Sequence, residues 1–250
     1  MPHAQPAFAA QPALELSKSK ETARPKKNSP EKNNAARELP APVRDLQAGT
    51  YKYHGTISIG SNDIAIDSSI TVAEENGIWK ASDIVLTPTG QVSDISTLEK
   101  RTLIVRTRKV QQGMQRIEVS FSDSKATGTV DFSGQQRAID VELGGPVFGD
   151  AAASGFAIGC LPLSDGYATS FRNFDLLRQK PTVMGLKVLR SEQIVVPAGT
   201  FDAYKVQLAS DDEGAEKSTL WIAKATHTPV KTSIALPQIG GATITQELLP

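Results

Sequence analysis

Few residues in this 250-residue chain have the side-chain chemistry of a catalytic or metal site. Its three histidines, His3, His54 and His227, lie far apart in the sequence. A nucleophilic serine on a strand-turn-helix elbow needs a G-x-S-x-G sequence, which neither Ser154 nor Ser164 has. Catalysis usually needs a base beside a nucleophile, or a bound metal. We therefore expect no enzyme activity, no catalytic residue, no metal site and no cofactor.

The single cysteine, Cys160, limits the cysteine chemistry further. One cysteine excludes an intramolecular disulfide and any metal centre built from several cysteines. A free cysteine in a folded chain most often behaves as a small buried apolar side chain. We expect that role for Cys160.

Charge is balanced over the whole chain but unevenly distributed. There are 27 basic and 27 acidic residues, and residues 1–44 hold 8 of the basic and 4 of the acidic ones. The remainder is mildly acidic, which disfavours binding to a phosphate backbone. No apolar run approaches the roughly 18 residues that a membrane-spanning helix needs. We expect neither a nucleic-acid partner nor a membrane span.

The first 45 residues are predicted to be a disordered basic tail, followed by one domain over residues 46–250. Between Ser17 and Arg44 there is almost no large apolar side chain, so the segment cannot bury enough surface to offset the entropy of ordering. Residues 7–11 have the small-x-small look of a signal-peptidase site, which suggests part of an export signal. Disorder rich in alanine, proline and glutamine is the alternative interpretation.

From residue 46 onward the sequence has the period-2 alternation of strands with one dry face. Tyr51, Tyr53, Ile57 and Ile59 alternate with polar residues, and similar segments recur between turn sequences up to the C-terminus. Without a βαβ rhythm, a parallel sheet is unlikely to form. Because hairpin follows hairpin, the pattern favours one strongly curved antiparallel sheet over a sandwich. We predict an incomplete barrel of about 10–12 strands.

Three local features accompany this pattern. Residues 150–163 are rich in alanine and glycine and predict one short helix that plugs the barrel, with Asp150 as its N-cap. The segment around Pro88 and Gly90 is interpreted as a loop before a strand that starts at Leu103. Residues 197–200 predict a turn in which Gly199 takes a positive φ.

Several segments together resemble a known group of domains. They are Gly159–Tyr167, Val195–Val206, Leu220–Ile222 and Thr228–Lys231. They resemble uncharacterised bacterial extracytoplasmic domains related to the LolA/LolB lipoprotein-sorting half-barrels, over residues 46–250. The resemblance implies a periplasmic or secreted protein whose concave sheet face holds an acyl chain or similar ligand. The chain departs from that pattern because it lacks a lipobox cysteine near its start.

The expected function is therefore a non-enzymatic binding or carrier module for an acyl chain or another apolar ligand. Candidates to line the concave face are Tyr51, Tyr53, Val119, Phe121, Val188, Tyr204, Val206 and Trp221. Arg190 and Glu192 interrupt an apolar row and are candidates for a rim that meets a polar headgroup. The alternative is a structural or protein-interaction module of the cell envelope, in which the same eight residues simply form a packed core. The expected partners are a lipid or other apolar small molecule, or an envelope protein.

Overall fold

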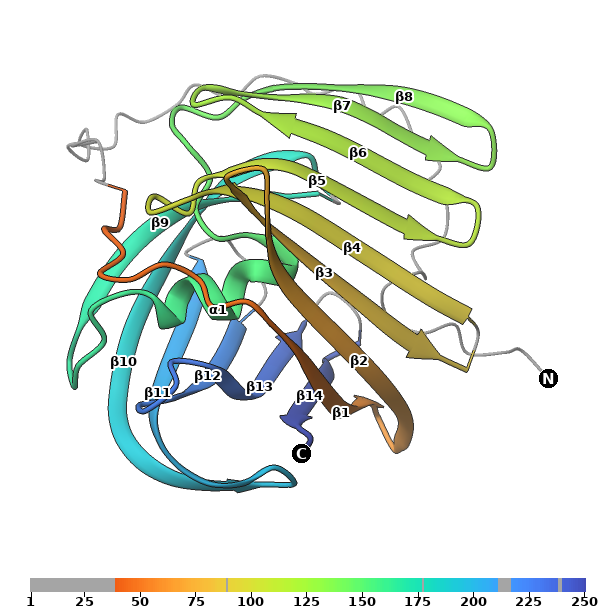
Figure 1. The fold of residues 1–250 in the computed structure, drawn as a ribbon. Helices are drawn as coiled ribbons and strands as arrows, with labels where there is room; N and C mark the ends of the chain where they lie inside the picture. The colour runs from red at the N-terminus through yellow and green to blue at the C-terminus, as the bar shows by residue number, and fades with distance from the viewer. Residues whose placement is uncertain (1–38, 89, 177, 211–216, 238–239) are drawn as a thin grey trace, which may run out of the picture.

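The fold is one long antiparallel sheet with a short helical segment against one face (Figure 1). The computed structural model describes residues 39–250 apart from residues 89, 177, 211–216 and 238–239. Its strands are β1 (Gly49–Ile59), β2 (Asn62–Glu75), β3 (Ile78–Thr87), β4 (Gly90–Glu99), β5 (Val105–Gln112), β6 (Gln115–Phe121), β7 (Lys125–Phe132), β8 (Gln135–Glu142), β9 (Ala168–Asp175), β10 (Lys180–Val196), β11 (Gly199–Ser210), β12 (Lys217–Ala223), β13 (Pro229–Leu236) and β14 (Ala242–Leu248). The helical segment is a 3₁₀ turn, η1 (Ala151–Ala153), followed by α1 (Ser154–Gly159).

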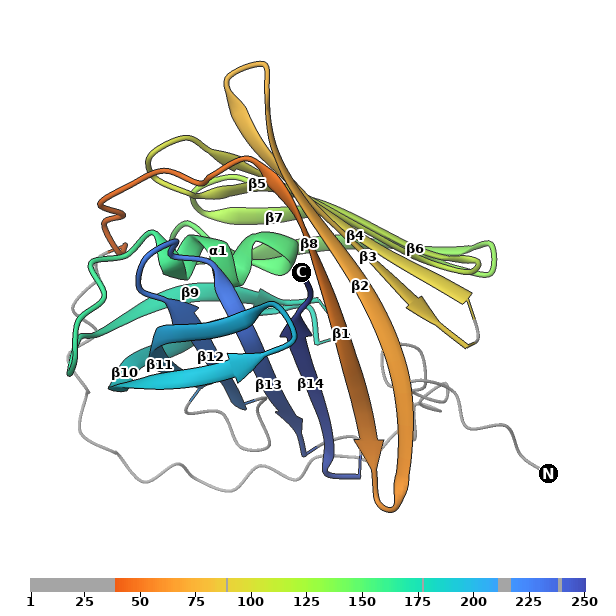
Figure 2. The same ribbon diagram turned by 60° about the horizontal axis from the view of Figure 1, so that its bottom comes forward.

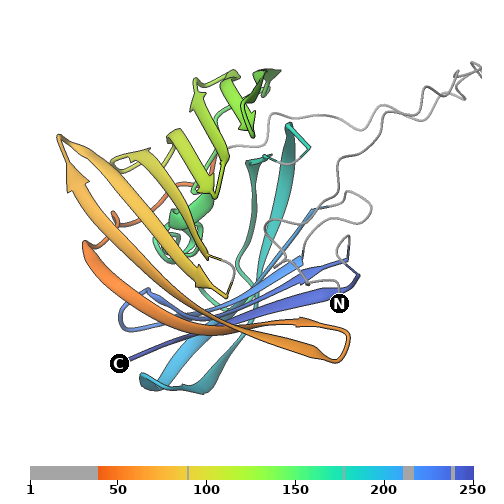
Figure 3. The same cartoon turned by 90° about the vertical axis from the view of Figure 1, so that its right-hand side faces the viewer.

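Two runs of hairpins build the sheet and meet in its middle. The strand order is β8-β7-β6-β5-β4-β3-β2-β1-β14-β13-β12-β11-β10-β9, so β1 pairs with β14 and the edges are β8 and β9. Figure 3 shows the two halves diverging like the arms of a V, with the helix between them. The predicted open, curved antiparallel sheet with one short helix is confirmed.

The connection from β8 to β9 links the two halves at one end. The Phe148 amide donates to the Arg172 carbonyl on β9 at 3.1 Å, while the Val105 amide on β5 donates to the Val147 carbonyl at 2.9 Å. The chain then forms η1, which contacts β3 and β4, and α1, which contacts β12 and β13. We call the face against which η1 and α1 pack the inner face, and these two elements the helical cover.

The main core lies between the inner face and the cover. Its large side chains with almost no exposure include Leu98, Phe148, Ile158, Phe174 and Ile222. Two smaller clusters lie apart from it. The first, at the β1–β2 and β13–β14 turns, consists of Ile57, Ile66, Leu236, Ala242 and Ile244. The second consists of Val196, Ala223 and Val230, with Trp221 packed against them.

Residues 39–46, within the stretch predicted as tail and domain start, pack onto the domain. This segment approaches α1 on its way to β1 (Figure 2), and the Val43 amide donates to the Cys160 carbonyl at 2.9 Å. The Trp79 indole N–H donates to the Asp45 carboxylate, and Leu46 is buried. The rest of the predicted tail, residues 1–38, lies outside the described residues.

The local predictions agree with the structure except in one region. Asp150 is the N-cap of η1, and its carboxylate accepts a bond from the Ala151 amide at 2.7 Å. Gly199 has a φ of 131°, as expected for its turn. The turn at Pro88 agrees with the predicted loop, but the next strand starts at Gly90 and not at Leu103, because residues 90–99 form the ten-residue strand β4. With β4 the described sheet has 14 strands, above the expected 10–12.

Candidate functional site on the inner face

The inner face is buried in the main core and in the separate cluster around Ile57, and several of its other apolar positions are only partly buried. Along β3 the inner row is Trp79, Ala81, Asp83 and Val85, of which the first two are buried and the last two only partly buried. Corresponding rows on other strands also end in half-buried apolar side chains. These side chains are Val110, Val130, Met184 and Ile234, in addition to Val85 on β3. Beyond the cover, the inner face therefore presents apolar side chains that retain access to solvent.

A group of polar side chains interrupts this apolar face between the covered and the open parts. We call it the concave polar cluster, and it consists of Ser68, Asp83, Asp94, Ser96, Arg108 and Asp150. Arg108 Nη2 donates to Asp94 Oδ2 at 2.7 Å, and its Nη1 donates to Asp150 Oδ2 at 3.1 Å. Ser68 Oγ donates to Asp83 Oδ1 at 2.9 Å. The cluster holds three carboxyl groups and one guanidinium.

The sheet register brings these residues together from five elements. Asp83 on β3 lies directly opposite Asp94 on β4, and Ser96 lies opposite Arg108 on β5. Side chains that are opposite each other in an antiparallel pair share a face and lie about 5 Å apart at Cβ. Asp150 reaches the same face from the N-cap of η1. One carboxylate thus both caps the cover and accepts a bond from the sheet.

Burial opposes charge at both ends of the Arg108–Asp150 pair. Loss of hydration alone would lower the pKa of Arg108, but the charges of Asp150 and Asp94 outweigh it and raise that pKa. Burial raises the pKa of Asp150, because it exceeds the opposing effects of Arg108 and the Ala151 amide. Buried ion pairs rarely give net stability over apolar packing. The pair is better understood as fixing the position of the cover on the sheet.

Asp83 is a second carboxyl of the cluster whose pKa is raised. Burial raises its pKa to about 6, the Ser68 hydroxyl opposes that effect, and the charge of Asp94 adds to it. No cation lies within ion-pair distance of Asp83 among the described residues. At neutral pH the cluster therefore contains a carboxylate without a counter-ion from the described part of the chain.

Asp83→Asn should stabilise the protein at pH 8 and have little effect at pH 4. The folded-state pKa lies above the ordinary value, so the stability linked to the neutral carboxyl is complete below about pH 4 and is lost as pH rises through 6. Asparagine is neutral throughout and can still accept from Ser68. Urea unfolding should show a gain on the order of 1 to 3 kcal/mol at pH 8. Asp67→Asn, at an exposed position, is the control; an equal gain for Asp83→Asn at both pH values would contradict the prediction.

The structure gathers most of the predicted lining residues, but largely in the buried main core. Val119, Phe121, Val188 and Val206 are fully buried in the main core, and the Phe121 ring meets Phe174 edge-on at 5.6 Å.

The three predicted tyrosines lie around these four residues. Tyr51 and Tyr204 are half-buried at the edge of the core, and the Tyr51 ring lies 4.7 Å from that of Phe156 in α1. Tyr53 is buried, and its hydroxyl donates to the Pro229 carbonyl at 2.8 Å.

Trp221 and the two rim candidates form a separate group. Trp221 follows Leu220 of the main core along β12 and packs with the Val196 cluster instead. Its indole N–H donates to Glu192 at 2.6 Å, and Glu192 also pairs with Arg190 at 2.7 Å. The ammonium groups of Lys205 and Lys231 lie 5.0 and 5.7 Å from its ring centroid. The structure thus brings Arg190, Glu192 and Trp221 together, away from the other lining candidates.

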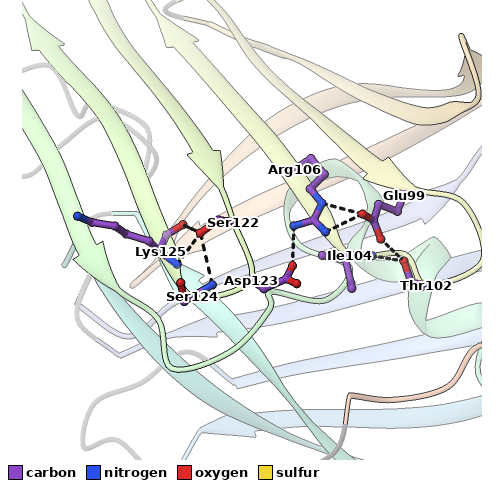
Figure 4. Close-up of polar contacts among 8 residues, drawn as sticks. All are labelled: Glu99, Thr102, Ile104, Arg106, Ser122, Asp123, Ser124 and Lys125. Carbon is purple, nitrogen blue, oxygen red and sulfur yellow. Dashed lines mark hydrogen bonds and ion pairs between the residues drawn. The ribbon is translucent and has the colours of Figure 1, made fainter.

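A further polar group lies where β4 and β6 end and where β5 and β7 begin (Figure 4). Arg106 lies between Glu99 and Asp123, with N–O distances of 2.6 and 2.8 Å. These side chains are about a third or more exposed, so solvent screens their attraction. This group is a surface counterpart to the buried concave polar cluster and serves below as a control.

The residues considered for nucleophilic and metal chemistry are not brought together. His54 is exposed and bonds Asp67 at 2.8 Å, whereas His227 lies in the turn after β12. Cys160 is buried, as expected, and burial raises the pKa of its thiol to about 12. Among the described residues, no three histidine, cysteine, aspartate or glutamate side chains are grouped as metal ligands would be. Over the same residues, neither helical element is long and apolar enough to cross a membrane.

The concave polar cluster was missed by sequence reasoning. The signal that could have revealed it is the presence of charged residues at inward positions of alternating strands. Asp83 lies between Ala81 and Val85 in one inner row, and Asp94 between Val92 and Ser96 in the next. Such a signal becomes useful only when the register of neighbouring strands is known.

Comparisons with known proteins identify related folds at low similarity. The hypothetical lipoprotein YmcC of Escherichia coli is 9% identical, with 80% of this chain and 84% of that chain covered and a TM-score of 0.32. A putative exported protein with a YmcC-like fold from Bacteroides fragilis is 9% identical, with 83% of this chain and 97% of that chain covered and a TM-score of 0.32. A DUF1329 family protein from Desulfovibrio piger is 9% identical, with 81% of this chain and 84% of that chain covered and a TM-score of 0.28. Likeness at this level carries nothing about function.

Two comparisons use the sequence alone. No curated protein matches the chain. A family model described as a protein of unknown function, DUF3108, matches residues 47–247, which is nearly the whole described domain.

Proposed function

The chain belongs to the DUF3108 family, whose function is unknown, and we propose from the geometry of its inner face that it binds an apolar, chain-like molecule there. The proposal covers the module as a non-enzymatic carrier or binding protein. Its likeness to the LolA/LolB half-barrels is part of the same proposal and comes from the sequence resemblance over residues 46–250.

The proposal rests on one observation: the apolar inner face of the sheet extends beyond the helical cover. Sheets of this length bury one face against another element, but η1 and α1 together comprise nine residues and contact only part of the strands. Beyond them, apolar side chains from both halves of the sheet remain partly exposed, including Val85, Val110 and Met184. Burying apolar surface yields about 25 cal/mol per Å², which would favour an apolar ligand on these side chains.

The location and the absence of catalysis belong to the same proposal. The small-x-small segment at residues 7–11 and the family resemblance support a place outside the cytoplasm. The described site offers three carboxyl groups, one guanidinium and two serine hydroxyls, and its one hydroxyl–carboxylate contact, Ser68 to Asp83, has no histidine or group of metal ligands beside it among the described residues. Binding is therefore the better-supported use of the site.

The fully buried residues are unsuitable for testing ligand binding. Val188 and Val206 are 0% exposed, so enlarging either one would overpack the core whether or not a ligand binds. The half-buried inner positions beyond the cover are the ones at which added volume would compete with a ligand.

Val110→Phe should weaken binding of dodecanol by about tenfold or more while changing the unfolding free energy by less than about 1 kcal/mol. Val110 is only partly buried on the inner row of β5, so a phenyl ring can extend over the face that the ligand would cover. Fluorescence displacement of an apolar dye, together with native mass spectrometry, would measure affinity and stoichiometry.

Val195→Phe supplies the matched control, because Val195 is 72% exposed near the β10–β11 turn and the same atoms are added. It should leave affinity unchanged. If neither dodecanol nor the dye binds the unmodified protein, the carrier function is ruled out. The envelope interaction module, with a packed interior, would then be the better interpretation.

A further inference from the structure

The charge of the concave polar cluster limits which ligand would fit the inner face. Arg108 is shared between Asp94 and Asp150, which leaves Asp83 without a cationic partner in the part of the chain that the structure describes. Asp83 is only partly buried, so it retains some access to solvent. Val85, the next inner position along β3, is partly buried as well. A carboxylate at such a place attracts a cation more strongly than one in open water.

A second polar atom in the same cluster also lacks a partner. Ser96 is fully buried, and its Oγ has no hydrogen-bond partner among the described residues. Ser96 is the next inner position after Asp94 along β4. In the β3–β4 register, Asp83 is opposite Asp94 and Ala81 is opposite Ser96, so Ser96 is a diagonal neighbour of Asp83. Buried hydroxyls are normally bonded, so this one marks a place where a ligand atom can complete the cluster.

We propose that the concave polar cluster binds the protonated amine of an amphiphilic ligand, with Asp83 as its counter-charge and Ser96 Oγ as a further acceptor. This inference rests on the proposed apolar-ligand function and specifies the polar end of that ligand. An ammonium group donates three hydrogen bonds and accepts none, which suits a carboxylate and a hydroxyl oxygen.

The groups around Asp83 favour an amine over an anionic headgroup. Asp94 faces it from β4, and Ser68 on β2 already donates to it. Tyr53 on β1 is close enough for its charge state to be affected by Asp83. Arg108 on β5 is the cation nearby, and two carboxylates hold it. An anionic headgroup would meet three carboxyl groups with one guanidinium that is already paired.

The apolar part of the ligand has a continuous surface beside this cluster. Val85 on β3 pairs with Val92 on β4, and Asp94 pairs with Val110 on β5. Val85 also packs against the cluster that contains Ile57 and Ile66. An alkyl chain attached to an amine at Asp83 would lie on these side chains, toward the open part of the inner face.

Three probes of equal chain length test the inference: dodecylamine, dodecanol and dodecanoic acid, each titrated below its micelle concentration at pH 7.5 by calorimetry. The full chain should bind dodecylamine between about 10-fold and 100-fold more tightly than dodecanol, as expected for a hydrogen bond to a charged group. Asp83→Asn should reduce that ratio to near one, and Ser96→Ala should reduce it in part. Asp67→Asn makes the same charge change at an exposed position and should keep the full preference.

Each outcome separates the two proposals. Equal affinity for all three probes would overturn the amine site while leaving apolar-ligand binding intact. An amine preference that persists in Asp83→Asn would also overturn it, since the headgroup would then bind elsewhere. Binding of none of the probes would overturn both proposals. Circular dichroism of each variant would confirm that lost preference reflects a folded protein.

Discussion

Replacing Arg108 by methionine should destabilise the domain by about 3 to 5 kcal/mol, because it leaves two buried carboxylates without their cation. The Arg108 side chain is 15% exposed, and its partners Asp94 and Asp150 are 19% and 7% exposed. Methionine keeps much of the side-chain length and removes the charge. Urea unfolding at pH 7, with the slope checked against the unmodified protein, measures the change.

Arg106→Met provides the matched control, two residues earlier on β5 and beside the register irregularity between β4 and β5. Arg106 also bridges two carboxylates, Glu99 and Asp123, but at the exposed strand ends (Figure 4). Its loss should cost less than about 1 kcal/mol. Adding Asp94→Asn and Asp150→Asn to Arg108→Met should recover part of the loss, because the uncompensated charges disappear. An equal cost for both arginine variants would show that Arg108 does not act through burial.

The Arg108 contacts also bear on ligand binding. Asp150 Oδ1 accepts a hydrogen bond from the Ala151 amide, and Oδ2 accepts one from Arg108. The Asp150 carboxylate therefore attaches the start of the helical cover to β5. Loosening that contact would expose core residues such as Ala153 and Phe156 in the cover. Arg108→Met should therefore change dye binding as well as stability: more dye should bind, and less specifically, than in the unmodified protein.

The sheet could be predicted from the sequence wherever its inner positions are apolar. Tyr51, Tyr53 and Ile57 in β1 and Ile117, Val119 and Phe121 in β6 follow a strict period of two and lie in strands as expected. Strand β4 was missed for a physical reason. Its inner row contains Asp94 and Ser96 between Val92 and Leu98, while Ile95 points the other way, so the period-2 pattern is lost.

The candidate site was harder to predict than the fold, because it depends on register and on the extent of the cover. The sequence shows that Val188 and Val206 are apolar and inward, but not that the main core buries them completely. At Trp221 a register irregularity falls between it and Ile222, and sequence alternation cannot reveal such a step. The contact between Arg108 and Asp150 joins residues 42 positions apart and follows no local pattern.

The other half of the cover is attached by backbone contact without a charge pair, at Gly159. A methyl group built on Gly159 would lie 2.0 Å from the His227 carbonyl oxygen and 3.5 Å from Ile222. His227 itself has a φ of 57°, in the turn after β12. The end of α1 can approach this turn so closely because residue 159 has no side chain.

Gly159→Ala should therefore cost about 3 kcal/mol, since an obstructing backbone carbonyl cannot rotate away as a side chain can. Either α1 or the turn at His227 must move, and the core residues Ile158 and Ile222 lose packing with it. Thermal and urea unfolding give the cost, and increased fluorescence of an apolar dye would report the displaced cover.

Gly155→Ala makes the same change four residues earlier in α1 and serves as the control. There the added methyl would meet the Pro229 ring at 3.0 and 3.3 Å, a tight contact with side-chain atoms. Alanine also favours a helix over glycine by about 1 kcal/mol, which offsets the crowding. Gly155→Ala should stay within about 1 kcal/mol of the unmodified protein, with unchanged dye fluorescence. If Gly159→Ala behaves the same way, α1 is free to shift, and the boundary between the covered and open parts of the inner face is not fixed at this contact.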